Sequence, residues 1–201
     1  MTKISICIII AGFIFLNSCA YYNTFFNAEE NYRMGLEKKK TNKNEKLPPD
    51  ISHHFNAAIA KSWTVIDLYG DSSRWADDAL LMIGKCHYQL EEYDKSQEVL
   101  EQFLQKYLKS DLIPDAELWL AKVYLKKNDT ENALKRLSSI TQSDGDDEIK
   151  AEAFYEIGEI YFDSGQYETA IQNYGSCIDL TSDSETAGNA QYKLADSYFK
   201  L

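Results

Sequence analysis

The chain repeats one pattern of residues at a fixed interval of 37 positions, and this repetition limits its fold more than any other feature. One column of the repeat holds small residues, at Gly84, Ala121, Gly158 and Ala195. Two further columns keep their character, with alanine at Ala79, Ala116, Ala153 and Ala190 and an aliphatic residue at Ile83, Leu120, Ile157 and Leu194. A fixed period with constant chemistry at each place is typical of repeat architectures. The sequence therefore predicts a solenoid, in which each repeat packs on its neighbours.

Each repeat has the pattern of a helical hairpin. In the third copy, Phe154, Ile157 and Tyr161 are three and four residues apart, which places them on one face of a helix. Gly165 suits the left-handed residue that often ends a helix. The same spacing then starts again, at Tyr167, Ala170, Tyr174 and Cys177. Two helices per repeat are predicted, and the fold class is all-α.

The third copy resembles the tetratricopeptide repeat. The residues that carry the resemblance are Gly158, Tyr161, Tyr167, Ala170 and Tyr174. The resemblance implies a right-handed solenoid of tetratricopeptide-like helical hairpins, here with a 37-residue period. Because the usual period of that family is about 34 residues, the extra residues are expected in loops between hairpins, for example around Lys109 to Pro114.

The repeats are predicted over residues 74–201, as copies at about 74–110, 111–147 and 148–184 and a partial copy at 185–201. The partial copy contains only its first helix and would expose Leu194 and Tyr198. We therefore expect that this sequence is a piece of a longer protein.

Residues 1–18 have the features of a lipoprotein signal peptide. Lys3 precedes an apolar run over residues 4–15, which is too short to span a membrane as a helix. The tetrapeptide LNSC that ends at Cys19 resembles a bacterial lipobox, in which the cysteine is acylated. The alternative is an ordinary signal peptide with a chance cysteine. The resemblance makes Cys19 the lipid-attachment residue, and Ala20 after it favours the outer membrane.

Residues 19–70 are expected to form an irregular first hairpin. Apolar spacing predicts a helix from Tyr21 to Glu37, and a polar run with Pro48 and Pro49 ends it. A second helix is predicted from about Ile51 to Tyr69. The aromatic start of this hairpin either packs on the next repeat or rests on the membrane interface.

Charge and cysteine content restrict the classes of partner. The formal net charge is −11, which argues against nucleic acid and against electrostatic binding to anionic lipid. Cys86 and Cys177 lie in the first and third repeats, which do not touch in a solenoid, so no internal disulfide is expected. Cys177 is expected to fill the core.

The sequence carries little that indicates chemistry. His53 and His54 are adjacent and His87 is isolated, whereas a helical metal pair needs a spacing of three or four residues. The acidic patches at 77–78 and 144–148 lack the spacing of a calcium loop. We expect no catalytic residue, no metal site and no cofactor, and the protein is predicted not to be an enzyme.

The junction from Tyr69 to Ala79 is expected to end one helix and cap the next. The hydroxyl of Ser72 or Ser73 could accept a hydrogen bond from the free backbone amides of the second helix, and Asp77 and Asp78 suit the positive end of that helix. The junction resembles those of the tetratricopeptide lipoprotein of the outer-membrane β-barrel assembly machinery and of related periplasmic repeat proteins.

The same resemblance predicts where a protein or peptide partner would bind. In tetratricopeptide arrays the first helices of successive hairpins line a concave groove. The 37-residue register predicts two apolar columns, Leu81, Leu118, Tyr155, Tyr192 and Tyr88, Leu125, Phe162, Phe199, with a charged column, Lys85, Lys122, Glu159, Asp196, between them. Such a groove would hold an extended or helical peptide, with the aromatic residues as its main anchors. The alternative for the second apolar column is core between repeats.

Two functions remain open at this point. The first is a lipid-anchored scaffold on the periplasmic face of the outer membrane, bound there through Cys19, with a role in outer-membrane protein assembly. The second is a repeat module of a longer envelope protein whose remaining part carries a cell-wall or polysaccharide-export activity.

Overall fold

The computed structural model of this chain describes residues 24–42, 46–70 and 75–201. Within these ranges the chain forms α-helices and contains no strand, so the predicted all-α class is confirmed. The predicted signal peptide, Cys19 and the capping serines Ser72 and Ser73 lie outside the described residues.

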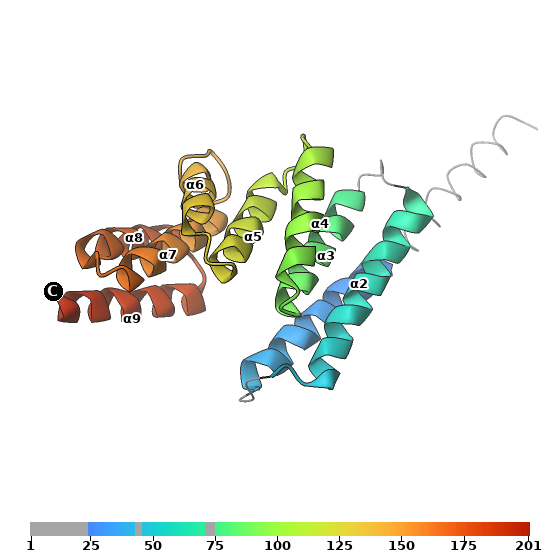
Figure 1. Cartoon of the computed structure of the whole chain (residues 1–201), viewed down its shortest axis with the longest axis horizontal. Helices are drawn as coiled ribbons and strands as arrows, with labels where there is room; N and C mark the ends of the chain where they lie inside the picture. The colour runs from blue at the N-terminus through green and yellow to red at the C-terminus, as the bar shows by residue number, and fades with distance from the viewer. Residues whose placement is uncertain (1–23, 43–45, 71–74) are drawn as a thin grey trace, which may run out of the picture. The chain divides into compact units, whose positions relative to one another are not determined.

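The helices follow one another with short connections (Figure 1). Residues 24–41 are helical and precede the labelled helices. The others are α2 (Pro49–Tyr69), α3 (Ala76–Gln89), α4 (Tyr93–Lys106), α5 (Ile113–Lys126), α6 (Thr130–Thr141), α7 (Asp147–Asp163), α8 (Tyr167–Leu180) and α9 (Ser184–Lys200). The second helices of the hairpins, α4, α6 and α8, begin at evenly spaced positions, whereas α7 and α9 both begin early for the register. No helix of the described ranges is long and apolar enough to cross a membrane.

The chain forms two compact units, one up to Val99 and one from Leu100 to Leu201. The boundary falls within α4, a position that the repeat pattern does not predict. Each unit has its own core.

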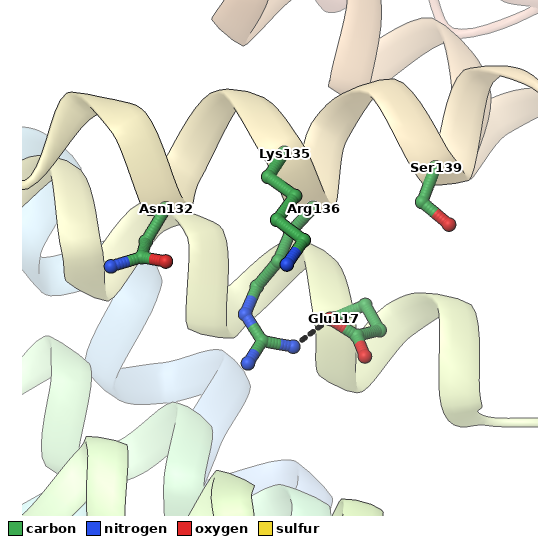
Figure 2. Close-up of a pocket in the computed structure, with 5 residues that line it drawn as sticks. All are labelled: Glu117, Asn132, Lys135, Arg136 and Ser139. Carbon is green, nitrogen blue, oxygen red and sulfur yellow. Dashed lines mark hydrogen bonds and ion pairs between the residues drawn. The ribbon is translucent and has the colours of Figure 1, made fainter.

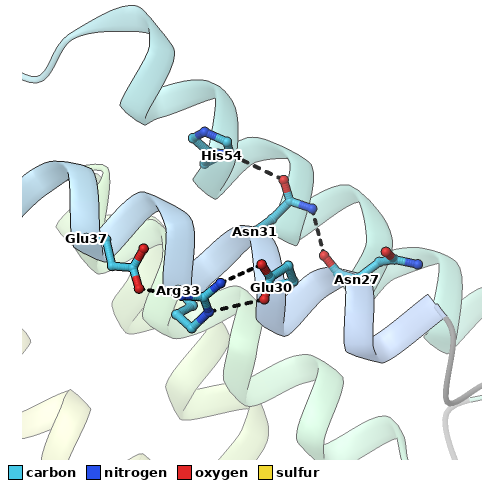
Figure 3. A network of polar contacts seen from close by, with 6 residues as sticks. All are labelled: Asn27, Glu30, Asn31, Arg33, Glu37 and His54. Carbon is cyan, nitrogen blue, oxygen red and sulfur yellow. Dashed lines mark hydrogen bonds and ion pairs between the residues drawn. The ribbon is translucent and has the colours of Figure 1, made fainter.

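In the first unit, residues 24–41 and α2 form the predicted first hairpin. The Tyr32 and Phe55 rings meet edge to face with centroids 5.9 Å apart, and both pack in a cluster that includes Cys86 of α3. Polar contacts border this core, as Figure 3 shows: Asn31 lies 3.4 Å from Nδ1 of His54 and donates to the Asn27 carbonyl. Pro49 opens α2, where a missing N–H costs nothing.

The turn between the two helices of a hairpin has the same geometry three times. Its central residue has a positive φ, 64° at Glu91, 60° at Asn128 and 75° at Gly165. In the third turn the Gly165 N–H donates to the Phe162 carbonyl and the Gln166 N–H to the Tyr161 carbonyl. This pair of bonds is the Schellman motif. The expectation that Gly165 ends its helix in the left-handed conformation is confirmed.

In the second unit, α7, α8 and α9 lie side by side (Figure 1). The Tyr174 ring of α8 lies against Gly158 of α7, where a Cβ would come within 2.6 Å of it. The space beside Gly158 is therefore filled by a side chain of the partner helix, and not only by the backbone of that helix. The alanine column is fully buried throughout, at Ala79, Ala116, Ala153 and Ala190.

Both cysteines of the repeats are buried free thiols, and Cys177 packs in the core with Ala151 and Ala190 as expected. Tyr198 is exposed, as predicted for the partial copy. Leu194 is partly buried, so the expectation of an exposed Leu194 is wrong, because this face of α9 packs on the preceding hairpin.

Candidate protein-interaction surface

The predicted partner residues divide into buried and exposed ones. Leu81 and Leu118 of the first apolar column are 3% and 1% exposed. Leu118 packs with Ala121 and Ile157 in the core of the second unit. These two leucines are core residues and present no surface to a partner, because α3 and α5 turn this position inward.

The aromatic members of that column lie on α7 and α9. Tyr155 is partly buried, and its ring centroid is 5.8 Å from that of Tyr174. Burial, together with Glu159 and Glu156, raises the pKa of Tyr155 to about 12. Tyr192, one repeat later, is 70% exposed. The two tyrosines share a register position, but only Tyr192 is open to solvent.

The second apolar column also contains both partly buried and exposed residues. Tyr88 and Phe162 each meet the first aromatic residue of the following helix, Tyr93 at 5.6 Å and Tyr167 at 5.5 Å between ring centroids. These contacts lie within one hairpin. Leu125 is partly buried, and Phe199 is 85% exposed.

The charged column does not form an open row, because Lys122 and Glu159 pair with residues of the neighbouring first helix. Nζ of Lys122 on α5 contacts Glu152 of α7 and lies 3.7 Å from Glu156. Glu159 of α7 accepts from Lys193 of α9 at 2.7 Å. Residues that face each other on adjacent first helices are therefore not at the same repeat position. Because of this stagger, charged residues of the expected column form ion pairs between helices. Lys85 and Asp196 are partly buried, on α3 and α9.

This arrangement gives the second unit a polar row flanked by aromatic rings. Lys122 lies over the Trp119 ring at 4.8 Å, and Lys193 lies over the Phe162 ring at 4.9 Å. Burial raises the pKa of Glu156, and Glu152 and Glu159 add to this effect while Lys122 opposes it. The row thus holds one more carboxylate than it holds lysines.

Sequence reasoning missed Trp119, Glu152, Glu156 and Lys193. Their signal was present in the chain, since Lys122 with Glu156 and Glu159 with Lys193 have the same sequence separation and opposite charges.

We name as the first-helix surface the exposed and partly buried residues of α7 and α9 in this region, Tyr155, Glu159, Phe162, Tyr192, Lys193 and Phe199. Tyr192 and Phe199 of α9 occupy the same repeat positions as Tyr155 and Phe162 of α7. On α7 these aromatic residues are covered by α8, whereas on α9 they are exposed.

A hollow of about 260 Å³ lies elsewhere, between α5 and α6. Figure 2 shows Glu117, Asn132, Lys135, Arg136 and Ser139 around it. Arg136 spans it to pair with Glu117, and its guanidinium also lies 5.4 Å from the centre of the Tyr124 ring. The pair is a structural contact between α5 and α6 at the wall of the hollow.

The histidines make local contacts. His87 Nδ1 lies 2.7 Å from Glu92, and the His53 and His54 rings lie 6.0 Å apart. Across residues 24–42, 46–70 and 75–201, no three histidine, cysteine or acidic side chains are grouped so that they could hold a metal ion.

Known proteins share the sequence pattern and the fold of this chain. A family profile described as a tetratricopeptide repeat-like domain matches residues 3–197. No curated protein sequence matches the chain. Similar solved structures include a MamA protein, with a TM-score of 0.50 and 16% identity over 87% of each chain. They also include a protein from Podosopora anserina described as a kinesin light chain with nearly identical TPR-like repeats, with a TM-score of 0.61 and 14% identity over 90% of this chain and 87% of that one.

A third is BtubC from P. vanneervenii, with a TM-score of 0.58 and 13% identity over 90% of this chain and 82% of that one. At these identities the likeness shows the fold alone. The fold is that of a scaffold suited to protein–protein interaction. The family profile covers nearly the whole sequence, and the chain therefore belongs to the tetratricopeptide repeat-like domain family.

Proposed function

We propose that this protein is a non-catalytic, lipid-anchored scaffold on the periplasmic face of the outer membrane and that it holds a protein partner on its first-helix surface. One observation supports the partner site: the first helices of the second unit repeat aromatic residues in register, Tyr155 and Phe162 on α7 and Tyr192 and Phe199 on α9, within a tetratricopeptide repeat-like fold. Groups of large aromatic side chains on a protein surface are typical of binding sites.

The form of the partner follows from how α8 covers α7. The equivalent aromatic residues Tyr155 and Phe162 are met by Tyr174 and Tyr167, one from each end of α8. A helical peptide with two apolar anchors about two turns apart would cover Tyr192 and Phe199 in the same way. The Glu159–Lys193 pair beside them would fix its direction through charge.

The cellular role rests on the sequence. The lipobox-like tetrapeptide ending at Cys19 supports a lipid anchor, and Ala20 supports the outer membrane. The likeness of the junction from Tyr69 to Ala79 to that of the β-barrel assembly lipoprotein supports a role in outer-membrane protein assembly.

The partner site is tested by site-specific photocrosslinking in cells. A photoreactive phenylalanine analogue at Tyr192 should yield a crosslinked protein adduct, and the same analogue at Gln172, an exposed residue of α8, should not. Tyr192→Ala combined with Phe199→Ala should abolish co-purification of the crosslinked protein. Both residues are exposed, so helicity should stay unchanged. Equal adducts at both positions would argue against the first-helix surface.

A further inference from the structure

The first unit exposes large hydrophobic side chains in one place. Among its described residues, those that are more than a third exposed are Phe26 at 49%, Trp63 at 41% and Leu68 at 65%. Phe26 belongs to the first helix, and the other two belong to the second half of α2. We call these three residues the first-hairpin patch.

The antiparallel pairing of the two helices brings the three residues to one end of the hairpin. Lys38 pairs with Asp50, and Tyr32 meets Phe55 edge to face, so positions that lie earlier in the first helix face positions that lie later in α2. At 1.5 Å per residue, Phe26 lies about 9 Å beyond Tyr32, and Trp63 lies about 12 Å beyond Phe55. Leu68 is in the last turn of α2. Figure 1 shows the N-terminal end of the first helix, in blue, and the C-terminal end of α2 at this same end.

The chain length from Cys19 places this end near a membrane if Cys19 is acylated. Phe26 follows Cys19 by so few residues that, at a maximum of about 3.6 Å per residue, the two cannot be more than about 25 Å apart. A protein held by acyl chains on Cys19 therefore keeps this end of the hairpin within about 25 Å of the bilayer surface.

The chemistry of the first-hairpin patch suits the headgroup region of a bilayer. Tryptophan combines an apolar body with an N–H donor and favours that region, and Phe26 and Leu68 add apolar area. The ionisable side chains adjacent in sequence are Glu29, Glu30 and Asp67 against Lys61 and Arg33, and Arg33 pairs with Glu30, which leaves one net negative charge. This favours lipids without net charge over anionic ones.

We propose that Phe26, Trp63 and Leu68 rest in the neutral phospholipid surface that holds the acyl chains of Cys19. The inference depends on the lipid anchor of the proposed function, because the short connection is what brings the first-hairpin patch to lipid. Anchor and patch would then act as two contacts that hold the first hairpin at the membrane in one orientation.

The test replaces the natural anchor by a chemical one, so that it does not depend on acylation in cells. The chain from Cys19 onward is coupled through that thiol to a maleimide phospholipid in phosphatidylcholine and phosphatidylethanolamine vesicles. Cys86 and Cys177 are buried, and burial raises the pKa of both thiols, that of Cys177 to about 11, so Cys19 reacts first. Trp75→Phe with Trp119→Phe leaves Trp63 as the reporter, and Trp63→Phe with Trp75→Phe leaves Trp119 as the matched control.

On tethering, Trp63 emission should shift to shorter wavelength and lose intensity when the vesicles contain brominated acyl chains. This quenching should exceed that of Trp119, whose ring lies under Lys122. Phe26→Ser with Leu68→Ser should reduce the Trp63 shift while circular dichroism stays unchanged. Adding phosphatidylglycerol should weaken the quenching. Equal quenching of both reporters, or none of Trp63, would overturn the proposal. A Trp63 shift that grows with protein concentration without vesicles would assign the patch to a second copy instead. Failure of the natural anchor would appear separately, in cell fractionation.

Discussion

At the scale of single residues, two glycines of the same hairpin have opposite surroundings. Gly158 of α7 has the Tyr174 ring where its Cβ would be, and Gly175 of α8 has open space within 4 Å of that position. Both lie within helices, where glycine costs backbone entropy relative to alanine. The Tyr174 contact is therefore what justifies a glycine at position 158.

Gly158→Ala should destabilise the protein by about 1–3 kcal/mol, because the buried ring has to move to admit a methyl group. Gly175→Ala is the matched control and should stabilise it by about 0.5–1 kcal/mol, since it only gains helix propensity. Urea unfolding followed by circular dichroism gives both values. A stabilising Gly158→Ala would mean that Tyr174 does not occupy this space.

A carboxyl group on α3 makes stability depend on pH. Burial, together with repulsion from Asp77 and Glu29 and against the opposing charge of Lys85, raises the pKa of Asp78 from its ordinary 3.8 to about 6. A carboxyl group with a raised pKa binds its proton more tightly in the folded state. Its contribution is fully present below about pH 4 and is lost as the pH rises through about 6.

Asp78→Asn should therefore raise the free energy of unfolding at pH 7.5 and leave it nearly unchanged at pH 4. The gain should be about 1 kcal/mol, because Asp78 is partly exposed and solvent screens its charge. It is also reduced by the loss of a negative charge in the first turn of α3. Unfolding measured across this pH range checks the profile, and an equal gain at both ends would contradict it.

At the scale of elements, the hairpin turn imposes the same backbone on three different residues. The left-handed position is held by Glu91, Asn128 and Gly165. Glycine adopts this conformation without steric cost, and asparagine tolerates it better than other side chains. The turn that carries Glu91 is the strained one.

Glu91→Gly should stabilise the first of these turns by about 1 kcal/mol, and Gly165→Ala should destabilise the third by a similar amount. Asn128→Gly should have the smallest effect of the three. Thermal unfolding of the three variants in one buffer gives the order. If Glu91→Gly lowered the midpoint, a contact of the Glu91 side chain would outweigh the backbone strain.

At the scale of the whole molecule, the proposed anchor decides where the protein is found. Residues 24–42, 46–70 and 75–201 supply no helix that could cross a membrane. The exposed aromatic residues of α9 lie in the second unit, and Cys19 falls in the sequence range of the first.

Cys19→Ser should move the protein from the membrane fraction to the soluble periplasm, because it removes the thiol that is acylated. Labelling cells with an alkyne fatty acid should mark the wild type and not the variant, and Cys86→Ser should keep the label. A variant that stays labelled and membrane-bound would exclude Cys19 as the attachment residue.

The sequence by itself determined the helices and the turns between them. The three-and-four spacing of Phe154, Ile157 and Tyr161 marks a helix face, and Gly165 marks its end, because both signals depend on local backbone geometry. The first hairpin could be predicted for the same reason, since Pro49 fixes where α2 begins. The buried alanine column also followed from the repeat.

Only the tertiary structure decided which of the repeated side chains face solvent. Leu118 and Tyr192 share a register position, yet one is 1% and the other 70% exposed. Lys122 and Glu159 share another, yet each pairs with a different residue of the neighbouring helix. Burial and pairing depend on how adjacent helices are staggered and on what covers each face. Neither is a property of one repeat, so a register derived from the sequence can align residues but cannot show which of them a partner can reach.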